Sequence, residues 1–157
     1  MKVLGVDPGS FVTGYGVIES QKTGVKLLEA GIIKPKHRDL LPHRLEKVYV
    51  HLGEVMETYK PDVVILEKLY THAQYLTTSS VLGHVRGVIC LLCAQKNILL
   101  AENSVKRIRK AVTGNGSATK EQTQAMVAHI LHVRKDDLTP DASDALALAL
   151  GYLSIGP

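Results

Sequence analysis

The 157-residue sequence contains no tryptophan, one phenylalanine and only two cysteines. Two cysteines cannot build the disulfide framework on which many small secreted proteins depend. No apolar run approaches the roughly 18 residues of a membrane helix, and Asp7 comes too early for a signal peptide. We therefore expect a cytoplasmic protein without a membrane segment, consisting of a single domain over residues 1–157.

Charge is distributed unevenly along the chain. Residues 1–67 carry 9 basic and 9 acidic side chains, residues 68–135 carry 10 basic and 2 acidic, and residues 136–157 carry 4 acidic and none that is basic. A basic middle beside an acidic end favours a surface for a polyanion next to a site for cations. A solvated basic face without a partner is the alternative.

Short apolar runs separated by turn residues predict three strands, at residues 2–7, 12–19 and 25–34. The short turn between the last two favours an antiparallel arrangement. Apolar side chains then recur every three or four residues from Leu41 to Tyr59, which predicts a helix of about five turns.

The uninterrupted apolar run at residues 63–66 predicts a strand buried on both faces. A strand, a helix and a second strand of this kind form a crossover unit with parallel strands. The remaining pattern predicts a helix at 77–96, a strand at 98–101, and helices at 104–113, at 119–133 and from 139 onward. We expect an α/β fold whose five-stranded mixed sheet has three antiparallel strands followed by two parallel ones, flanked by helices.

Four carboxylates stand at positions that the predicted elements bring together. Asp7 and Glu67 each end a strand, and adjacent parallel strands place both at one edge of the sheet. Asp141 and Asp144 lie three residues apart in the first turn of the last helix, so they share one face. Because like charges this close repel each other, divalent cations between them are the simplest explanation.

Oxygen ligands without cysteine or histidine suit Mg²⁺, for which Mn²⁺ can substitute. Two such ions about 3.5–4 Å apart support phosphodiester hydrolysis. Structural roles are the alternative for the helix acids, because Asp141 suits a helix N-cap and Asp144 suits the helix dipole. Glu67 is harder to explain structurally, since it directly follows four apolar residues.

A set of motifs runs in order along the chain: VLGVDPGSFVTGYGVI at residues 3–18, LE at 66–67, LGHVRGV at 82–88, Lys106, GNGSATK at 114–120 and DASDALA at 141–147. Over nearly the whole length of the sequence, this set shows a resemblance to RuvC-type Holliday junction resolvases. It implies an RNase H-like fold and a homodimer that nicks opposing strands of a four-way DNA junction, leaving 5′-phosphate and 3′-hydroxyl ends. It further implies two metal ions per subunit and a partnership with the RuvA–RuvB branch-migration complex.

The resemblance also assigns roles to individual residues. The catalytic and metal-binding acids would be Asp7, Glu67, Asp141 and Asp144, with Lys120 as a further catalytic residue. Lys106 and Lys120 would lie near the scissile phosphate, and Tyr70 would stack on junction bases. The residues expected to contact DNA are Tyr70, Arg86, Lys106, Arg107, Arg109, Lys110 and Lys120. For the cations of the 104–113 helix, a solvated helix face is the alternative.

Other features have simpler interpretations or depart from the family pattern. Cys90 and Cys93 lie inside an apolar helix, so we expect core packing rather than redox chemistry or zinc binding. His129 and His132 share one helix without an evident third ligand, so surface or packing roles are expected. Lys68, Tyr70 and the pair at 84–85 differ from the usual family residues, which bears on the preferred cleavage sequence.

Three other functions remain to be weighed. A kinase with the same phosphate-loop pattern needs two lobes and more than twice this length. A junction-binding protein that does not cleave would not need all four acids. A related RNase H-like nuclease acting on structured RNA shares the fold, but the ending DASDALA at residues 141–147 is closer to the resolvases.

Overall fold

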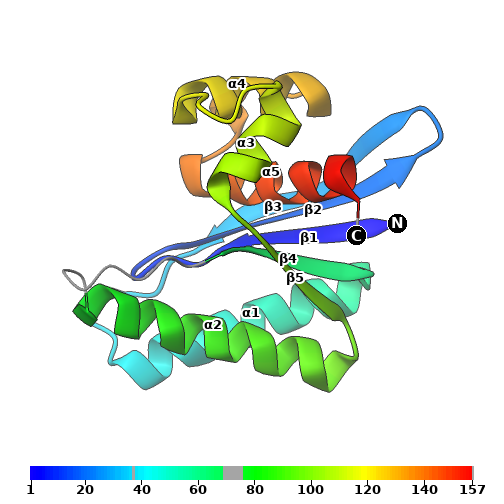
Figure 1. Ribbon diagram of the computed structural model, residues 1–157. Helices are drawn as coiled ribbons and strands as arrows, with labels where there is room; N and C mark the ends of the chain where they lie inside the picture. The colour runs from blue at the N-terminus through cyan, green and yellow to red at the C-terminus, as the bar shows by residue number, and fades with distance from the viewer. Residues whose placement is uncertain (37, 69–75, 157) are drawn as a thin grey trace.

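A five-stranded sheet forms the middle layer of the protein (Figure 1). The computed structural model describes residues 1–36, 38–68 and 76–156, without the side chains of residues 76–79. The strands are β1 (Lys2–Asp7), β2 (Thr13–Gln21), β3 (Gly24–Ile33), β4 (Val63–Glu67) and β5 (Leu99–Asn103). They lie in the order β3-β2-β1-β4-β5, with β1, β2 and β3 antiparallel and β1, β4 and β5 parallel. The predicted mixed sheet is thereby confirmed.

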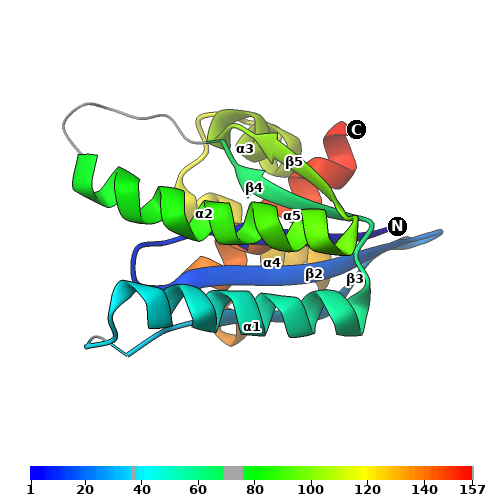
Figure 2. The same ribbon diagram turned by 90° about the horizontal axis from the view of Figure 1, so that it is seen from below.

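Helices cover both faces of this sheet. The helices are α1 (Leu41–Tyr59), α2 (Leu76–Lys96), α3 (Val105–Thr113), α4 (Lys120–Leu131) and α5 (Pro140–Ile155), with a short 3₁₀ turn, η2 (Lys135–Asp137). α1 and α2 lie side by side on one face, whereas α3, α4 and α5 lie on the other (Figures 1 and 2). Within the described part of the chain, every helix is too short or too polar to serve as a bilayer span.

Side-chain caps fix the starts of the helices on the α5 face. The hydroxyl groups of Ser104, Thr119 and Thr139 each accept a hydrogen bond from the backbone N–H three residues further along the chain. Thr119 and Gln122 form a reciprocal capping box, which satisfies two otherwise unpaired N–H groups. These starts agree with the sequence pattern, while α4 ends slightly earlier than expected because His132 adopts a left-handed conformation with φ 55°.

Two hydrophobic cores flank the sheet, and strand alternation divides residues between them. Leu4 and Val6 of β1 point toward α1 and α2, where they join one core. Val3 of β1 and Ile65 of β4 point the other way and join the core beneath α5. Each core therefore draws on alternate residues of the same central strands.

The two cysteines differ from each other in their surroundings. Cys93 is buried, as expected, and burial raises the pKa of its thiol to about 11. Cys90 is exposed, so the expectation of core packing was wrong for this residue. Residues three apart on a helix point only about 60° apart, so Cys90 lies at the edge of the helix face that buries Cys93.

Candidate active site

Strand alternation and register place Asp7 and Glu67 together. Val6 of β1 pairs with Leu66 of β4 in the parallel ladder, so the next residue of each strand stands at the same edge. Asp7 has the parity of Val3, and Glu67 has the parity of Ile65, which both lie in the core beneath α5. Both acids therefore belong to the face that α5 covers.

Glycines in the strands allow α5 to lie directly on the sheet. A Cβ at Gly5 would stand 1.9 Å from the backbone oxygen of Ala145, and one at Gly14 would stand 2.0 Å from that of Asp141. Any side chain at either position would push the helix away. This close approach brings the first turn of α5, with Asp141 and Asp144, to the edge where β1 ends. The sequence interpretation missed this role, although glycines inside apolar strands are a signal of close backbone approach.

A cavity of about 310 Å³ opens at this edge. Its lining comes from strand ends, α3, α4 and α5 and consists of Asp7, Glu67, Val105, Ile108, Arg109, Lys120, Thr123, Asp144, Ala147 and Leu148. Three of the four predicted acids thus line one cavity together with two cations. Asp141 does not line it, but its charge acts on Asp7 and on Lys120. Buried Thr123 is a lining residue that sequence reasoning did not identify.

Burial and neighbouring acids raise the pKa of two carboxyl groups, those of Asp7 and Glu67. Burial raises the pKa of Asp7 from 3.8 to about 7, and repulsion from Asp144, Glu67 and Asp141 adds to this effect. Burial and Asp144 likewise raise the pKa of Glu67, although nearby Arg and Lys side chains oppose the rise. A carboxyl with a pKa near neutrality in a cavity is a feature typical of functional sites.

Lys120 is the cation most closely tied to these acids. Its Nζ lies 2.5 Å from Oδ2 of Asp144, and this hydrogen bond raises the pKa of the ammonium group. Lys120 is also the first residue of α4, directly after the capping residue Thr119. Its backbone is therefore fixed, while its side chain remains about half exposed and open to the cavity.

The donor set fits a hard divalent cation in its chemistry. It consists of carboxylate oxygens alone, and three acids line the cavity against the two cations Lys120 and Arg109. Throughout residues 1–36, 38–68 and 76–156, however, no three His, Cys, Asp or Glu side chains already surround a common point. In the structure Asp144 is instead engaged by Lys120.

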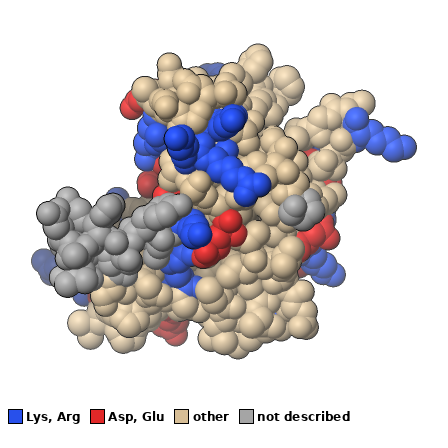
Figure 3. Space-filling model, in the orientation of Figure 1, with Lys and Arg blue, Asp and Glu red and all other residues tan. Residues whose placement is uncertain are grey.

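The remaining predicted cations lie on the outer surface of α3. Lys106, Arg107 and Lys110 are exposed, while Ile108 and Val112 are buried against α5 and the neighbouring core. Figure 3 shows Lys and Arg atoms gathered over α3, directly above acidic atoms at the edge of the sheet. The expected basic ridge therefore stands beside the acidic cavity, with Arg109 belonging to both.

The structure gives Arg86 surroundings that differ from the expectation of a DNA contact. Its guanidinium donates to the backbone oxygen of Glu67 and pairs with the carboxylate of Glu102, and its side chain is only 11% exposed.

Tyr70, expected to stack on bases, lies outside the described residues. His129 on α4 and His132, the left-handed cap that follows α4, are both exposed, in line with the expected surface roles.

Known proteins resemble this chain both in sequence and in fold. Residues 3–152 match the family described as "Crossover junction endodeoxyribonuclease RuvC". A relative of that name from Rhodopirellula baltica is 38% identical over 157 residues, which span 99% of this chain and 88% of the relative. Among solved structures, Thermus thermophilus RuvC in complex with Holliday junction substrate superposes with a TM-score of 0.91 at 24% identity, covering 99% of this chain and 94% of that one. The yeast mitochondrial Holliday junction resolvase Ydc2 has a TM-score of 0.69 at 13% identity, with 97% and 77% covered.

Proposed function

The chain belongs to the RuvC family of crossover junction endodeoxyribonucleases, and from this premise we propose that it cuts four-way DNA junctions at the acidic cavity. The observation that carries the proposal is the convergence of Asp7, Glu67 and Asp144 on one cavity, with Asp141 close by. These acids come from three distant segments and stand in the order of the family pattern. Residues 1–157 then form one nuclease domain.

Asp7, Glu67, Asp141 and Asp144 are the residues that would hold the metal, with two Mg²⁺ ions per subunit. When bound, such ions supply Lewis-acid stabilisation of the attacking and leaving oxygens of a phosphodiester. The raised pKa of Asp7 means that this carboxyl binds a proton or a cation near neutral pH, so cation binding and proton release are coupled. Lys120 engages Oδ2 of Asp144, so Oδ1 is the oxygen left for a cation unless the lysine moves away.

Lys120 and Arg109 provide the positive charge on the substrate side of the cavity. A lysine released from Asp144 carries three donors on a flexible stem and can follow a phosphate oxygen. Its charge then offsets the charge that develops on the phosphate as the bond to the leaving oxygen breaks. Lys120 thus has two partners at different stages, the carboxylate before substrate binding and the phosphate after it.

The ridge formed by Lys106, Arg107 and Lys110 would hold the DNA backbone outside the cavity. Contacts of this kind give affinity that falls with salt and carry little sequence information. A four-way junction has two equivalent strands to cut, and the described residues of this chain form one acidic cavity, so a homodimer would supply the second. The RuvA–RuvB complex as a partner and the bacterial cytoplasm as the location complete the proposal.

A synthetic four-way junction tests this function directly. The wild-type protein in Mg²⁺ should produce symmetric nicks with 5′-phosphate and 3′-hydroxyl ends that ligase can seal. Asp7→Asn should reduce the cleavage rate by at least about 10³-fold, because it removes one anionic ligand of the site. Its junction affinity in EDTA should stay within about threefold of wild type.

Three other outcomes would contradict this proposal. Binding without any nick in the wild-type protein would indicate a junction-binding role without cleavage. Preferential cleavage of structured RNA would indicate the related RNA-directed nucleases. A variant Asp7→Asn that cuts as fast as wild type would remove the acidic cavity as the active site.

A further inference from the structure

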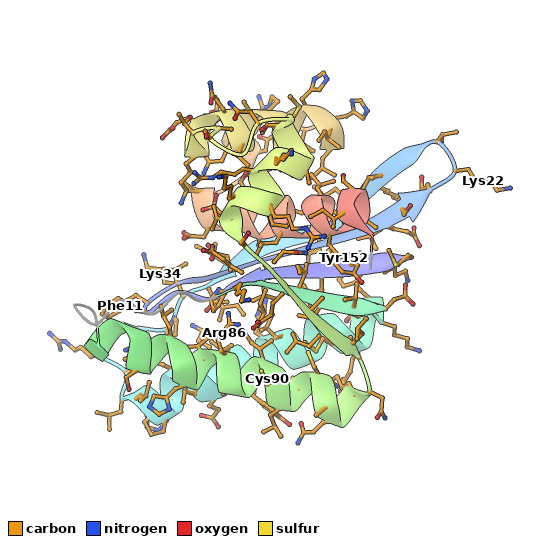
Figure 4. All side chains as sticks on the ribbon, in the orientation of Figure 1. Phe11, Lys22, Lys34, Arg86, Cys90 and Tyr152 are labelled. Carbon is orange, nitrogen blue, oxygen red and sulfur yellow. The ribbon has the colours of Figure 1, made fainter. Side chains whose placement is uncertain are left out.

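Arg86 connects three elements at the end of β4. It projects from α2 toward the sheet, as Figure 4 shows. Its Nη1 donates to the backbone oxygen of Glu67 at 2.7 Å, and its Nη2 pairs with Oε1 of Glu102 on β5. One guanidinium therefore contacts both of the last two strands of the sheet, from the face opposite the acidic cavity.

The contact lies at the point where the strand ladder ends. Glu67 and Asn103 are the last pair of β4 and β5, and the N–H of Lys68 donates to the backbone oxygen of Asn103 at 2.9 Å. On the β1 side the paired residues stop one position earlier, at Leu66. Because β4 is paired on one side only at Glu67, the hydrogen bond from Arg86 is an additional restraint on that residue's backbone.

The surroundings of Arg86 do not suit a phosphate contact. The side chain is only 11% exposed, and both terminal nitrogens already have oxygen partners within the protein. Glu102 also offsets its charge. A guanidinium in this situation can offer DNA little free charge, whereas Lys106 and Arg107 on α3 are exposed.

We propose that Arg86 is a positioning residue of the nuclease site, which holds the backbone of Glu67 so that its carboxylate faces Asp7 and Asp144 across the cavity. This inference rests on the proposed function of that cavity. The guanidinium suits the task because its planar fork can donate to a carbonyl and to a carboxylate at fixed relative angles. Glu102 fixes the other end of the fork, so the carbonyl receives a donor that is itself held in place.

The physical consequence concerns metal affinity. Groups that hold a ligand by hydrogen bonds, without touching the metal, typically change metal affinity or activity by 10–100-fold when they are removed. Loss of Arg86 should therefore loosen the carboxylate and make it a weaker ligand, while the DNA-binding surface on α3 stays intact.

The test separates metal binding from DNA binding. Mn²⁺ binding is measured without DNA by electron paramagnetic resonance, and junction binding is measured in EDTA. Arg86→Met should weaken Mn²⁺ binding by about 10-fold or more, with junction affinity within about twofold of wild type. Arg86→Lys keeps the charge but loses the fork, so its Mn²⁺ affinity should be intermediate.

Two control variants sharpen the comparison. Arg107→Met on exposed α3 should show the reverse pattern, with weaker junction binding and unchanged Mn²⁺ affinity. Lys96→Met removes another ion-paired cation of α2, whose Nζ lies 2.7 Å from Oε1 of Glu57, and should change neither measurement. If Arg86→Met is too unstable to measure, Arg86→Lys and Glu102→Ala decide the question by the same two measurements.

The proposal would be overturned by either of two results. Normal Mn²⁺ affinity with weakened junction binding in the Arg86 variants would make Arg86 a DNA contact, and wild-type values in both measurements would leave it without this role. A failure of the function itself looks different, because the wild-type protein would then not cleave the junction and Asp7→Asn would bind Mn²⁺ as wild type does.

Discussion

The two faces of the sheet are built in different ways. On the α1–α2 face, large apolar side chains such as Leu52 and Ile89 separate the helices from the strands, and both are fully buried. On the α5 face, glycines and alanines let a helix backbone approach within contact of the strand backbone, as Gly5 does with Ala145. Large side chains thus space the helices from the sheet on the first face, whereas small residues bring α5 close to the sheet on the second.

The difference between the two faces follows from the positions of the clustered acidic residues. The clustered carboxylates need side chains from strand ends and from a helix start at short range, and a helix held off by large side chains would separate them. The α1–α2 face has a polar network of its own, in which Tyr15 donates to Glu29 and contacts His51, but that network is paired within the protein. Arg86 links this face to the edge of the cavity through its hydrogen bond to the backbone of Glu67.

The largest expected effect comes from a substitution that prevents the close approach of α5 to the sheet. In Gly5→Ala, the new Cβ would stand 1.9 Å from the oxygen of Ala145, so α5 must move or the chain must fail to fold. We expect a loss of about 4 kcal/mol or more in the free energy of unfolding. Urea denaturation followed by circular dichroism measures it. A stable, fully active Gly5→Ala would show that backbone proximity is not what builds the α5 face.

The second-largest expected effect is a pH dependence of the stability of the metal-free protein, which Asp7 causes. Its pKa is raised from 3.8 to about 7 in the folded state, so its favourable contribution to stability is complete below pH 3.8 and is lost as the pH rises through 7. The full shift corresponds to roughly 4 kcal/mol, which solvent screening reduces to about 2–3 kcal/mol.

Thermal unfolding in EDTA from pH 5 to 8 checks the sign. Relative to Asp7→Asn, wild type should lose stability over this range, and Mg²⁺ at pH 8 should restore it, since a cation replaces the proton. A stability difference that does not change with pH would contradict the raised pKa of Asp7.

A smaller effect is expected on the opposite face. Tyr15→Phe removes a hydroxyl that donates to Oε1 of Glu29 at 2.7 Å and lies 3.0 Å from Nε2 of His51. The loss should be about 1–2 kcal/mol in unfolding free energy, because a hydrogen bond to a charged group is removed. Junction cleavage should be unchanged. The exposed pair of Tyr49 with Gln95 offers a control, and Tyr49→Phe should cost less.

The smallest expected effect comes from a glycine substitution on the α1–α2 face. A Cβ at Gly53 of α1 would meet only a methyl carbon of Leu92, at the ordinary distance of 3.7 Å. Gly53→Ala should therefore be neutral or stabilise the protein by about 0.5–1 kcal/mol, because alanine favours the helix. A strongly destabilised variant here would mean that the α1–α2 face is packed as closely as the α5 face.

Much of the architecture could be predicted from local patterns. Helical spacing gave α1 its limits at Leu41 and Tyr59, and Thr119 and Thr139 marked helix starts because their hydroxyls cap free N–H groups. The apolar runs of β1 and β4 placed Asp7 and Glu67 at strand ends. The least predictable details were element ends, such as β5, which continues to Asn103 because its pairing with β4 continues to Glu67.

The sequence by itself determined which acidic residues stand at strand ends and in a helix first turn, and so are candidates for the chemistry, because these positions and the order of the motifs are local properties of the chain. Only the tertiary structure decided how those residues meet. Gly5 and Gly14 matter because of a helix more than 120 positions away, and Arg86 pairs with Glu102 because α2 crosses β4 and β5. Contacts between distant segments depend on packing, and no local periodicity encodes them.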